Sequence, residues 1–468
     1  MAAFLSSPGA SNQYSWRKAV CVIWLAVVVA SAAGLAVFDA EVAPDPEVGR
    51  AYLLHGDYIG AGIPIGLWRD LHAGLPVPGP ALPRPGVDPS VPWDMNQYVT
   101  PEGVEVVSGV NCIGCHASPF MGGLVIGMGN SFADWTMSGG DMTPLKIVGG
   151  LKYPPGSDEA TVLKRFFRGA DVLEGTTATP FRGVVPAFRL EELAAAHRDP
   201  KTLGWSDERV FDPSPAIVAS DVPAWWGLHK KSSIYFNGMG QGDAARLIQQ
   251  IGIVMMDDKT DALRVLPRMR DVLAYIKTLE PPEYPAPIDP KLVARGAEVF
   301  AASCVSCHGT YGPGDAWTYP NKRVPVEEVG TDPHYARAIA TSGLVDWYNR
   351  SWFASDGATY ADATESYVAP PLDGVWSTAP YLHNGSVPDL ASLLNSFERP
   401  VRWRRSFQDD DYDLGRVGWR FETVGPDTET GPEVYDTTVE GYGNQGHTYG
   451  DGLSEEDRWA LIEYLKTL

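Results

Sequence analysis

One five-residue pattern, which occurs twice, constrains this chain more than any other feature. The two copies are Cys112-Ile-Gly-Cys115-His116 and Cys304-Val-Ser-Cys307-His308. The pattern C-x-x-C-H is typical of covalent attachment of c-type haem. Its two thiols add across two haem vinyl groups, and the next residue places its imidazole under the iron. Four of the five cysteines of the chain lie in these copies. The sequence therefore predicts two covalently bound c-type haems, with His116 and His308 as iron ligands.

Two other kinds of site also use paired cysteines. A CxxC pair occurs in redox disulfides and in structural zinc sites. Here the pairs are 304 − 115 = 189 residues apart, and a histidine follows each pair directly. Neither a redox dithiol nor a zinc ribbon needs that histidine. Haem attachment is therefore the preferred interpretation of both motifs.

Length and composition limit the fold and the class of partner. A chain of 468 residues is expected to hold two or three domains. Its 49 glycines and 39 prolines predict long loops, and the porphyrin would supply part of the core. The net charge of −21 argues against nucleic acid as a partner, because nucleic-acid binding needs a basic face. The same charge would attract a basic redox partner protein, although a solvated acidic surface explains it equally well.

The N-terminus has the features of an export segment. Arg17 and Lys18 precede an uncharged run over residues 19–38, and acidic residues follow the run. Twenty apolar residues are enough to span a bilayer. The charge bias places residues 1–18 in the cytoplasm and the rest outside. Ala30-Ser-Ala32 also fits a signal-peptidase site. We expect an exported protein on the periplasmic or extracytoplasmic face, anchored in the membrane by residues 19–38 or released by cleavage.

An internal repeat divides the remaining chain. Tyr275-Ile-Lys-Thr-Leu279 and Tyr464-Leu-Lys-Thr-Leu468 each close an amphipathic run, expected as helices over Met269–Leu279 and Leu453–Leu468. A further helix is expected from Pro290 to the second motif. The segment Glu280–Pro287 is rich in proline and predicts a stiff linker.

The predicted fold is therefore mainly α, with two cytochrome c-like domains and long Gly/Pro-rich loops after an anchor helix. Their expected bounds are 45–280 for the first domain, 281–290 for the linker and 291–468 for the second domain. Pro76–Pro92 is expected to be a surface strap. The acidic segment Gln408–Glu440 is expected to be a solvated loop, with Ca²⁺ binding as the alternative.

Several segments resemble the di-haem cytochrome c peroxidase superfamily, and the likeness is closest to its rubber-oxygenase-type branch. The segments that carry the resemblance are Asp221-Val-Pro-Ala-Trp-Trp-Gly227, Gly330-Thr-Asp-Pro333, Tyr367-Val-Ala-Pro-Pro-Leu-Asp-Gly-Val-Trp376, Ala379-Pro-Tyr-Leu-His-Asn-Gly-Ser-Val-Pro388 and Asn444-Gln-Gly-His447. The resemblance is strong in the second half and looser in the first. This chain is shorter than rubber oxygenases, and its segment Leu228–Lys231 is more basic.

The resemblance implies one haem in each domain. The first haem would be the place of peroxide or dioxygen chemistry, and the second would be a six-coordinate electron-transfer haem. By similarity, His447 is the sixth ligand of the second haem, and Trp226 lies between the haems. For that ligand His383 is the alternative, although it is better explained as a structural histidine. Packing is the alternative role of Trp226.

The sixth ligand of the first haem is left open by the sequence. An open position would allow peroxide or dioxygen to bind. The candidate side chains are Met121, Met128, Met137, Met142, Met239, His55 and His72. The candidate partners of the haem propionates are Arg168, Arg182, Arg295 and Arg337.

The sequence thus predicts a di-haem c-type cytochrome that transfers electrons at covalent haem. The alternative is a di-haem peroxidase or oxygenase, with chemistry at the first haem and electrons supplied by the second through Trp226. A haem-bearing subunit of a membrane respiratory complex is the third possibility.

Overall fold

The computed structural model describes residues 43–137, 142–314, 316–426, 428 and 431–468. By their contacts, residues Asp45–Leu468 group as one unit, separate from the residues before them. We call residues 45–280 the first half and residues 281–468 the second half. The predicted anchor over residues 19–38 lies outside the described residues. No helix in the described part of the chain is long and apolar enough to cross a bilayer.

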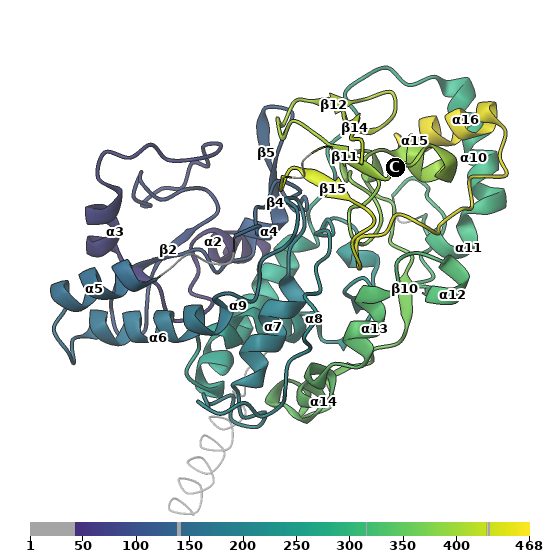
Figure 1. Ribbon diagram of the computed structural model, residues 1–468. Coiled ribbons are helices and arrows are strands. Elements are labelled where there is room, and N and C mark those ends of the chain that lie inside the picture. Colours follow the sequence, from purple (N-terminus) through teal and green to yellow (C-terminus); the bar gives the residue numbers. More distant parts are fainter. Residues whose placement is uncertain (1–42, 138–141, 315, 427, 429–430) are drawn as a thin grey trace, which may run out of the picture. The chain divides into compact units, whose positions relative to one another are not determined.

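The regular elements are mostly helical, with small sheets of two or three strands (Figure 1). The helices of the first half are α2 (Pro46–His55), α3 (Ile65–His72), α4 (Ile113–His116), α5 (Thr143–Lys152), α6 (Asp158–Leu173), α7 (Ala187–Ala196), α8 (Ala244–Gln249) and α9 (Lys259–Ile276). Its strands are β1 (Ile63–Pro64), β2 (Asn96–Val99), β3 (Glu105–Ser108), β4 (Ala117–Phe120), β5 (Gly123–Ile126), β6 (Ser233–Ile234) and β7 (Gly240–Gly242).

The second half has the same mixture of short elements. Its helices are α10 (Pro290–Ser303), α11 (Val305–His308), α12 (Val326–Val329), α13 (His334–Ala340), α14 (Gly343–Arg350), α15 (Leu390–Leu394) and α16 (Glu455–Leu465). Its strands are β8 (Arg323–Pro325), β9 (Thr359–Ala361), β10 (Ser366–Val368), β11 (Arg402–Arg404), β12 (Tyr412–Asp413), β13 (Gly418–Trp419), β14 (Glu422–Thr423) and β15 (Val434–Asp436).

The internal repeat is confirmed as two pairs of packed helices. In the second half, α10 packs on α16, and in the first half α2 packs on α9. Both α2 and α10 begin with an aspartate cap followed by proline, which suits the first turn of a helix. The helices predicted at both chain repeats and at Pro290 are thus present, although α9 begins earlier than the sequence indicated.

A glycine lets each helix pair approach closely. A methyl group added to Gly49 of α2 would lie 1.9 Å from the carbonyl oxygen of Asp271 in α9. A methyl group added to Gly296 of α10 would lie 1.9 Å from the carbonyl oxygen of Ala460 in α16. Asp271 and Ala460 each stand four residues before the tyrosine of the repeated pentapeptide, so the two crossings are equivalent.

The two halves contribute to one apolar core and to one β-sheet. Strand β7 of the first half pairs with β6 and, across the halves, with β9, so that Gly240 faces Ala361. The largest apolar cluster combines first-half residues such as Tyr58 and Met269 with second-half residues such as Trp347. The linker segment also packs on the second half, because Trp376 Nε1 donates to the carbonyl of Pro282 over 2.8 Å. The division of the chain at 281–290 stays a prediction.

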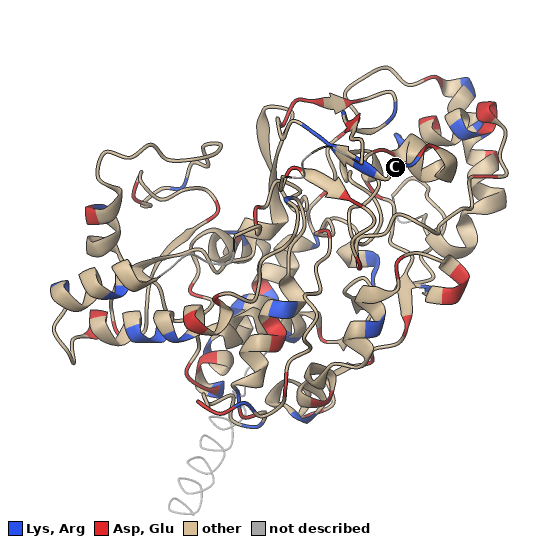
Figure 2. Cartoon of the chain, viewed as in Figure 1, with Lys and Arg blue, Asp and Glu red and all other residues tan. Residues whose placement is uncertain are grey.

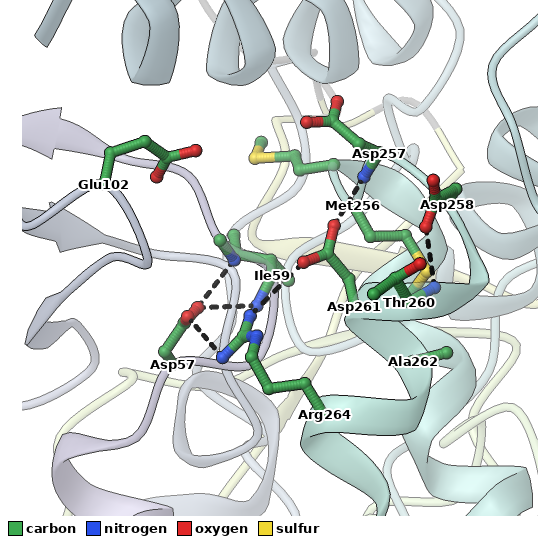
Figure 3. Close-up of polar contacts among 12 residues, drawn as sticks. Asp57, Ile59, Glu102, Met256, Asp257, Asp258, Thr260, Asp261, Ala262 and Arg264 are labelled. Atoms are coloured by element: carbon green, nitrogen blue, oxygen red, sulfur yellow. Dashed lines mark hydrogen bonds and ion pairs between the residues drawn. The ribbon is translucent and has the colours of Figure 1, made fainter. Parts of the chain in front are cut away.

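Ion pairs hold the start of α9 against the preceding loops (Figure 3). Arg264 pairs with Asp57 at 2.9 Å and approaches Asp261 at 3.6 Å. Arg165 of α6, whose side chain is 9% exposed, pairs with Glu102 at 2.7 Å and with Asp257 at 2.6 Å. This network ties α2, α6 and α9 together near the first motif.

Of the two segments expected to be loops, one has no regular structure and the other contains strands. Residues 76–92 contain no helix or strand and are largely exposed, as expected for a strap. Residues 408–440 are not a plain solvated loop, because they include β12, β13, β14 and β15 and bury Trp419 and Tyr435. Aromatic residues between the acidic ones supply this core, which the acidic composition concealed.

Candidate haem sites

The second motif opens into a cavity of about 350 Å³. Cys304, Cys307 and His308 line it, together with His447 from the C-terminal segment. Its walls are largely apolar and include Phe300, Leu390, Leu394, Leu461 and Leu465, from α10, α15 and α16. The volume and lining are typical of a cofactor pocket.

His308 and His447 face each other across this cavity. Their ring centroids are 6.3 Å apart, and their ring planes form an angle of 65°. A single metal ion bonded to one nitrogen of each ring would hold the ring centres about 6 Å apart, given metal–nitrogen bonds of about 2 Å. The two rings are therefore spaced for the opposite axial positions of one iron.

Each motif histidine has its second ring nitrogen fixed by a backbone carbonyl. His308 Nδ1 donates to the carbonyl of Pro370 over 2.8 Å, and His116 Nδ1 donates to that of Pro223 over 3.2 Å. Because a carbonyl only accepts, Nδ1 carries the proton and Nε2 is left free to bind metal. Burial lowers the pKa of His116 to about 4 and lowers that of His308, which favours the neutral form of both rings.

The backbone of His447 is held in place by two contacts. Its amide donates to the carbonyl of Val329 over 2.8 Å, and Arg399 donates to its carbonyl over 3.1 Å. The preceding residue must be glycine, because a methyl group on Gly446 would lie 2.2 Å from the amide nitrogen of Thr331. The Gly330–Pro333 segment thus packs directly against the backbone of the Gly446–His447 turn. Burial lowers the pKa of His447 to about 3.

His383 lies in the same cavity but has another partner. Its Nε2 is 3.0 Å from the hydroxyl of Tyr367, and the two rings stack with centroids 4.1 Å apart. The ring is 6% exposed. A nitrogen engaged by a tyrosine hydroxyl suits a structural histidine. The ligand roles of His447 and His383 stay predictions.

The first motif is enclosed by a different set of elements. The segment after β5 runs along it, because the Gly127 amide donates to the carbonyl of His116 and the Asn130 amide to that of Cys115, both over 2.8 Å. Trp225 stacks on the His116 ring, with centroids 4.4 Å apart and planes 19° apart. The tryptophan thus covers one face of the imidazole.

The candidates for the sixth position of the first haem are scattered. Met121 and Met137 are 39% and 81% exposed. Met128 packs in the cluster around Phe120 and Trp226, and Met239 in the cluster that Cys112 contacts. Met142 caps the N-terminus of α5, His55 ends α2, and His72 stacks on Trp68 with centroids 3.6 Å apart. The identity of this ligand stays open.

Trp226 lies between the motifs, next to Trp225. It is 2% exposed, lines the cavity of the second motif and donates from Nε1 to the carbonyl of Asp373 over 2.6 Å. Consecutive tryptophans therefore serve different motifs: Trp225 contacts His116, while Trp226 lines the His308 cavity. Sequence reasoning singled out only Trp226; the repeated Trp-Trp within Val222–Gly227 was the available signal.

The cysteines do not have the properties of a thiolate site. Burial raises the pKa of Cys115 and that of Cys304 to about 11 each. Reactive and zinc-binding cysteines need the opposite shift. Among the residues that the structure describes, no group of three or more His, Cys, Asp or Glu side chains is placed to hold a metal ion.

The four arginines predicted to pair with haem propionates form ion pairs with other groups. Each pairs with a carboxylate outside the cavity: Arg168 with Asp257 at 3.1 Å, Arg182 with Asp134 at 3.3 Å, Arg295 with Asp457 at 2.7 Å and Arg337 with Glu365 at 2.9 Å. The lysines that line the cavity are Lys231 and Lys322. Sequence reasoning missed both, because nothing in the sequence indicates that either reaches the second motif.

The acidic residues considered as Ca²⁺ ligands also have partners within the chain. Arg420 pairs with Asp413 at 3.0 Å and lies 3.7 Å from Asp411, and Asp409 accepts from the amide of Gly122. Figure 2 shows acidic and basic residues distributed together over the elements. The basic redox partner suggested by the net charge stays a prediction.

Comparison with known proteins supports the cytochrome assignment over a short segment. The family model described as "RoxA-like, cytochrome c-like" matches residues 366–404. That segment includes all of Tyr367–Pro388, which carries part of the resemblance. A cytochrome c-like segment indicates a haem-based redox role, with c-type haem, and implies a location outside the cytoplasm.

Two curated relatives come from Sinorhizobium fredii (strain NBRC 101917 / NGR234), and both are called uncharacterized. Protein y4iJ is 31% identical over 254 residues, which cover 41% of this chain and 41% of the relative. Protein y4iM is 28% identical over 288 residues, which cover 54% of this chain and 65% of the relative. The matches thus span less than two thirds of either relative's length.

Among solved structures, a chain of Kuenenia stuttgartiensis hydrazine synthase pressurized with xenon matches 65% of this chain and 92% of its own length. Its sequence identity is 14% and its TM-score is 0.24. A score this low supports no argument about fold or function.

Proposed function

We propose that the protein is a di-haem c-type cytochrome that transfers electrons, with one haem attached to each CxxCH motif. The observation that carries the proposal is the pair His308 and His447, which face each other at 6.3 Å across a cavity lined by Cys304 and Cys307. Bound c-type haem supplies a one-electron couple whose potential depends on its axial ligands. The protein supplies the two imidazoles and the apolar walls.

The chain's own residues suit electron transfer at the second site. If His308 and His447 both hold the iron, no position would be left there for a substrate. The carbonyl of Pro370 fixes the orientation of His308, and the Val329 carbonyl fixes the backbone of His447. Little has to move when the charge of such a site changes by one electron. Trp226 and Trp225 provide aromatic groups between this cavity and His116.

A peroxidase or oxygenase is the second candidate, and one observation favours it. The two motifs are differently built: His308 faces a second histidine, whereas His116 is covered on one face by Trp225. In that case the second site would supply electrons to an open or openable first site. The cytochrome c-like match over residues 366–404 is compatible with either function.

Two measurements test the proposal. The haem content of the purified protein, measured as the pyridine haemochrome, should be two per chain and should resist acid extraction because both haems are covalent. EPR spectra should then be taken after adding one electron per molecule. Low-spin signals that do not respond to peroxide support the electron-transfer cytochrome.

Other outcomes would overturn it. A high-spin ferric signal that peroxide shifts would mean an open first site and would favour the enzyme. A protein that carries zinc or no covalent haem would exclude both candidates. The same samples, made as His116→Ala and His308→Ala variants, assign each spectrum to its motif.

A further inference from the structure

The second haem cavity is not built by the second half alone. The first-half segment from Asp221 to Lys231 forms part of its wall, together with Cys304, His308 and His447. Most of the lining from this segment is apolar or backbone, but Lys231 brings an ammonium group. A cation from one half thus lies in the pocket of the motif that belongs to the other.

Lys231 is a half-buried lysine without a compensating carboxylate in the described part of the chain. Within the described part of the chain, its side chain makes no hydrogen bond or ion pair, and burial lowers its pKa to about 8. Its neighbour Lys230, in contrast, pairs with Asp373 at 2.6 Å. A buried charge is strongly disfavoured unless an opposite charge lies beside it. An anion bound in the cavity beside Lys231 would stabilise its ammonium charge.

The other lysine of the cavity is already compensated. The side chain of Lys322 is 37% exposed, and its Nζ lies 3.8 Å from Glu328. Solvent and that carboxylate can stabilise its charge without help from a ligand. Lys231 is therefore the lysine whose charge calls for a bound carboxylate.

We propose that Lys231 is the counter-charge for a haem propionate at the His308–His447 site, so that a first-half residue holds the cofactor of the second half and raises its reduction potential. This inference rests on the proposed function. Haem carries two carboxylates at one edge, and a lysine beside either would form a charge-assisted hydrogen bond. A nearby positive charge favours the reduced state, because reduction adds a negative charge to the site.

The test is an EPR-monitored redox titration of the full-length holoprotein and three variants. Lys231→Met should lower the reduction equilibrium constant of the second haem by at least about tenfold, which is 59 mV for a one-electron couple. Lys231→Arg keeps the charge and should change the constant by much less. Lys291→Met removes an exposed lysine of α10 that does not line the cavity, and it should have a small effect.

The outcomes separate this inference from the proposed function. Two covalent haems in the wild-type protein establish the cofactor, whatever the variants do. An unchanged potential in Lys231→Met, or an equal shift in Lys291→Met, would overturn the role of Lys231. If Lys231→Met accumulates no haem protein, Lys231→Gln and Lys231→Arg are compared for haem content. If only Lys231→Arg regains the wild-type haem content, a positive charge at this position is required. If Lys231→Gln regains it as well, the charge is not required.

Discussion

Trp225 lies flat on the imidazole of His116, with ring centroids 4.4 Å apart. The next residue, Trp226, lines the cavity of His308. Two indoles adjacent in sequence thus reach from one CxxCH motif to the cavity of the other. Since an aromatic group in the gap shortens each tunnelling step, this dipeptide is a candidate path for electrons between the motifs.

Replacing these tryptophans should slow electron transfer between the haems. We expect Trp226→Phe to reduce the rate several-fold, because the smaller ring also loses the hydrogen bond to the Asp373 carbonyl. Trp225→Phe should have an effect of similar sign. The rate is measured by flash reduction of the fully oxidised protein, followed at the absorption bands of both haems.

A matched control exists in Trp403→Phe. Trp403 is also buried and donates from Nε1 to a carbonyl, that of Ser386, but it stacks on Tyr435 in a separate cluster. Its substitution should leave the rate unchanged. An equal loss of rate in all three variants would mean that the tryptophans act through packing alone.

Removing His447 should open the second haem. We expect His447→Gly to convert its low-spin ferric signal to high spin, since one of two axial imidazoles is lost. Added imidazole should enter the space and restore the low-spin spectrum. The comparison variant is His383→Gln, whose ring is hydrogen-bonded to Tyr367. A high-spin signal in His383→Gln, with none in His447→Gly, would exchange the roles of the two histidines.

The glycines at the two helix crossings should be hard to replace. Gly49→Ala and Gly296→Ala each bring a methyl group within 1.9 Å of a carbonyl oxygen, so the helices must separate. We expect each to lower the free energy of unfolding by about 2 kcal/mol or more, as other overpacked cores do.

The control for these variants is Gly150→Ala in α5, where a methyl group would meet nothing within 4 Å. That change should be neutral or raise the free energy of unfolding by up to about 1 kcal/mol, because alanine is the better helix former. Denaturant unfolding of the three variants measures the difference. Equal effects at Gly49 and Gly150 would contradict a close crossing.

The sequence predicted those features that depend on local pattern. The CxxCH motifs, the helix start at Pro290 and the closing helices follow from spacing and capping, which neighbouring residues determine. The contact that holds His447 has no local signal, since the carbonyl of Val329 that accepts from its amide is 118 residues away. The role of Pro223 and Pro370 as partners of the motif histidines was missed for the same reason.

Long-range charge compensation was the least predictable feature. Four arginines were plausible propionate partners by charge, yet each pairs with a carboxylate. Lys231, which lines the cavity, has no ion-pair partner in the part of the chain that the structure describes. The strand pairing of Gly240 with Ala361, which joins the halves, carries no signal in composition or periodicity. Such features depend on which segments meet, and that is decided by the whole fold.

The last prediction concerns pH and a partly buried glutamate, Glu191. Glu191 of α7 accepts from Gln250 Nε2 over 2.8 Å and from the hydroxyl of Tyr235 over 3.3 Å. Burial raises its pKa from 4.5 to about 7, because these neutral donors only partly replace water. Tyr335 and Tyr348 also lie near its charge. Between about pH 4.5 and pH 7 the folded protein therefore binds a proton that the unfolded chain does not.

Stability should consequently fall as the pH rises through this window, and Glu191→Gln should abolish that fall. One pKa unit corresponds to about 1.36 kcal/mol. The free energy of unfolding of Glu191→Gln, relative to that of the wild type, should therefore rise by up to about 3 kcal/mol from pH 5 to pH 8. Denaturant unfolding at both pH values measures it, and Glu174→Gln at the exposed end of α6 serves as the control. Taking the difference between variants cancels the other titrating groups. If the two variants differ from the wild type by amounts that do not change with pH, Glu191 is already ionised in the folded protein at pH 5.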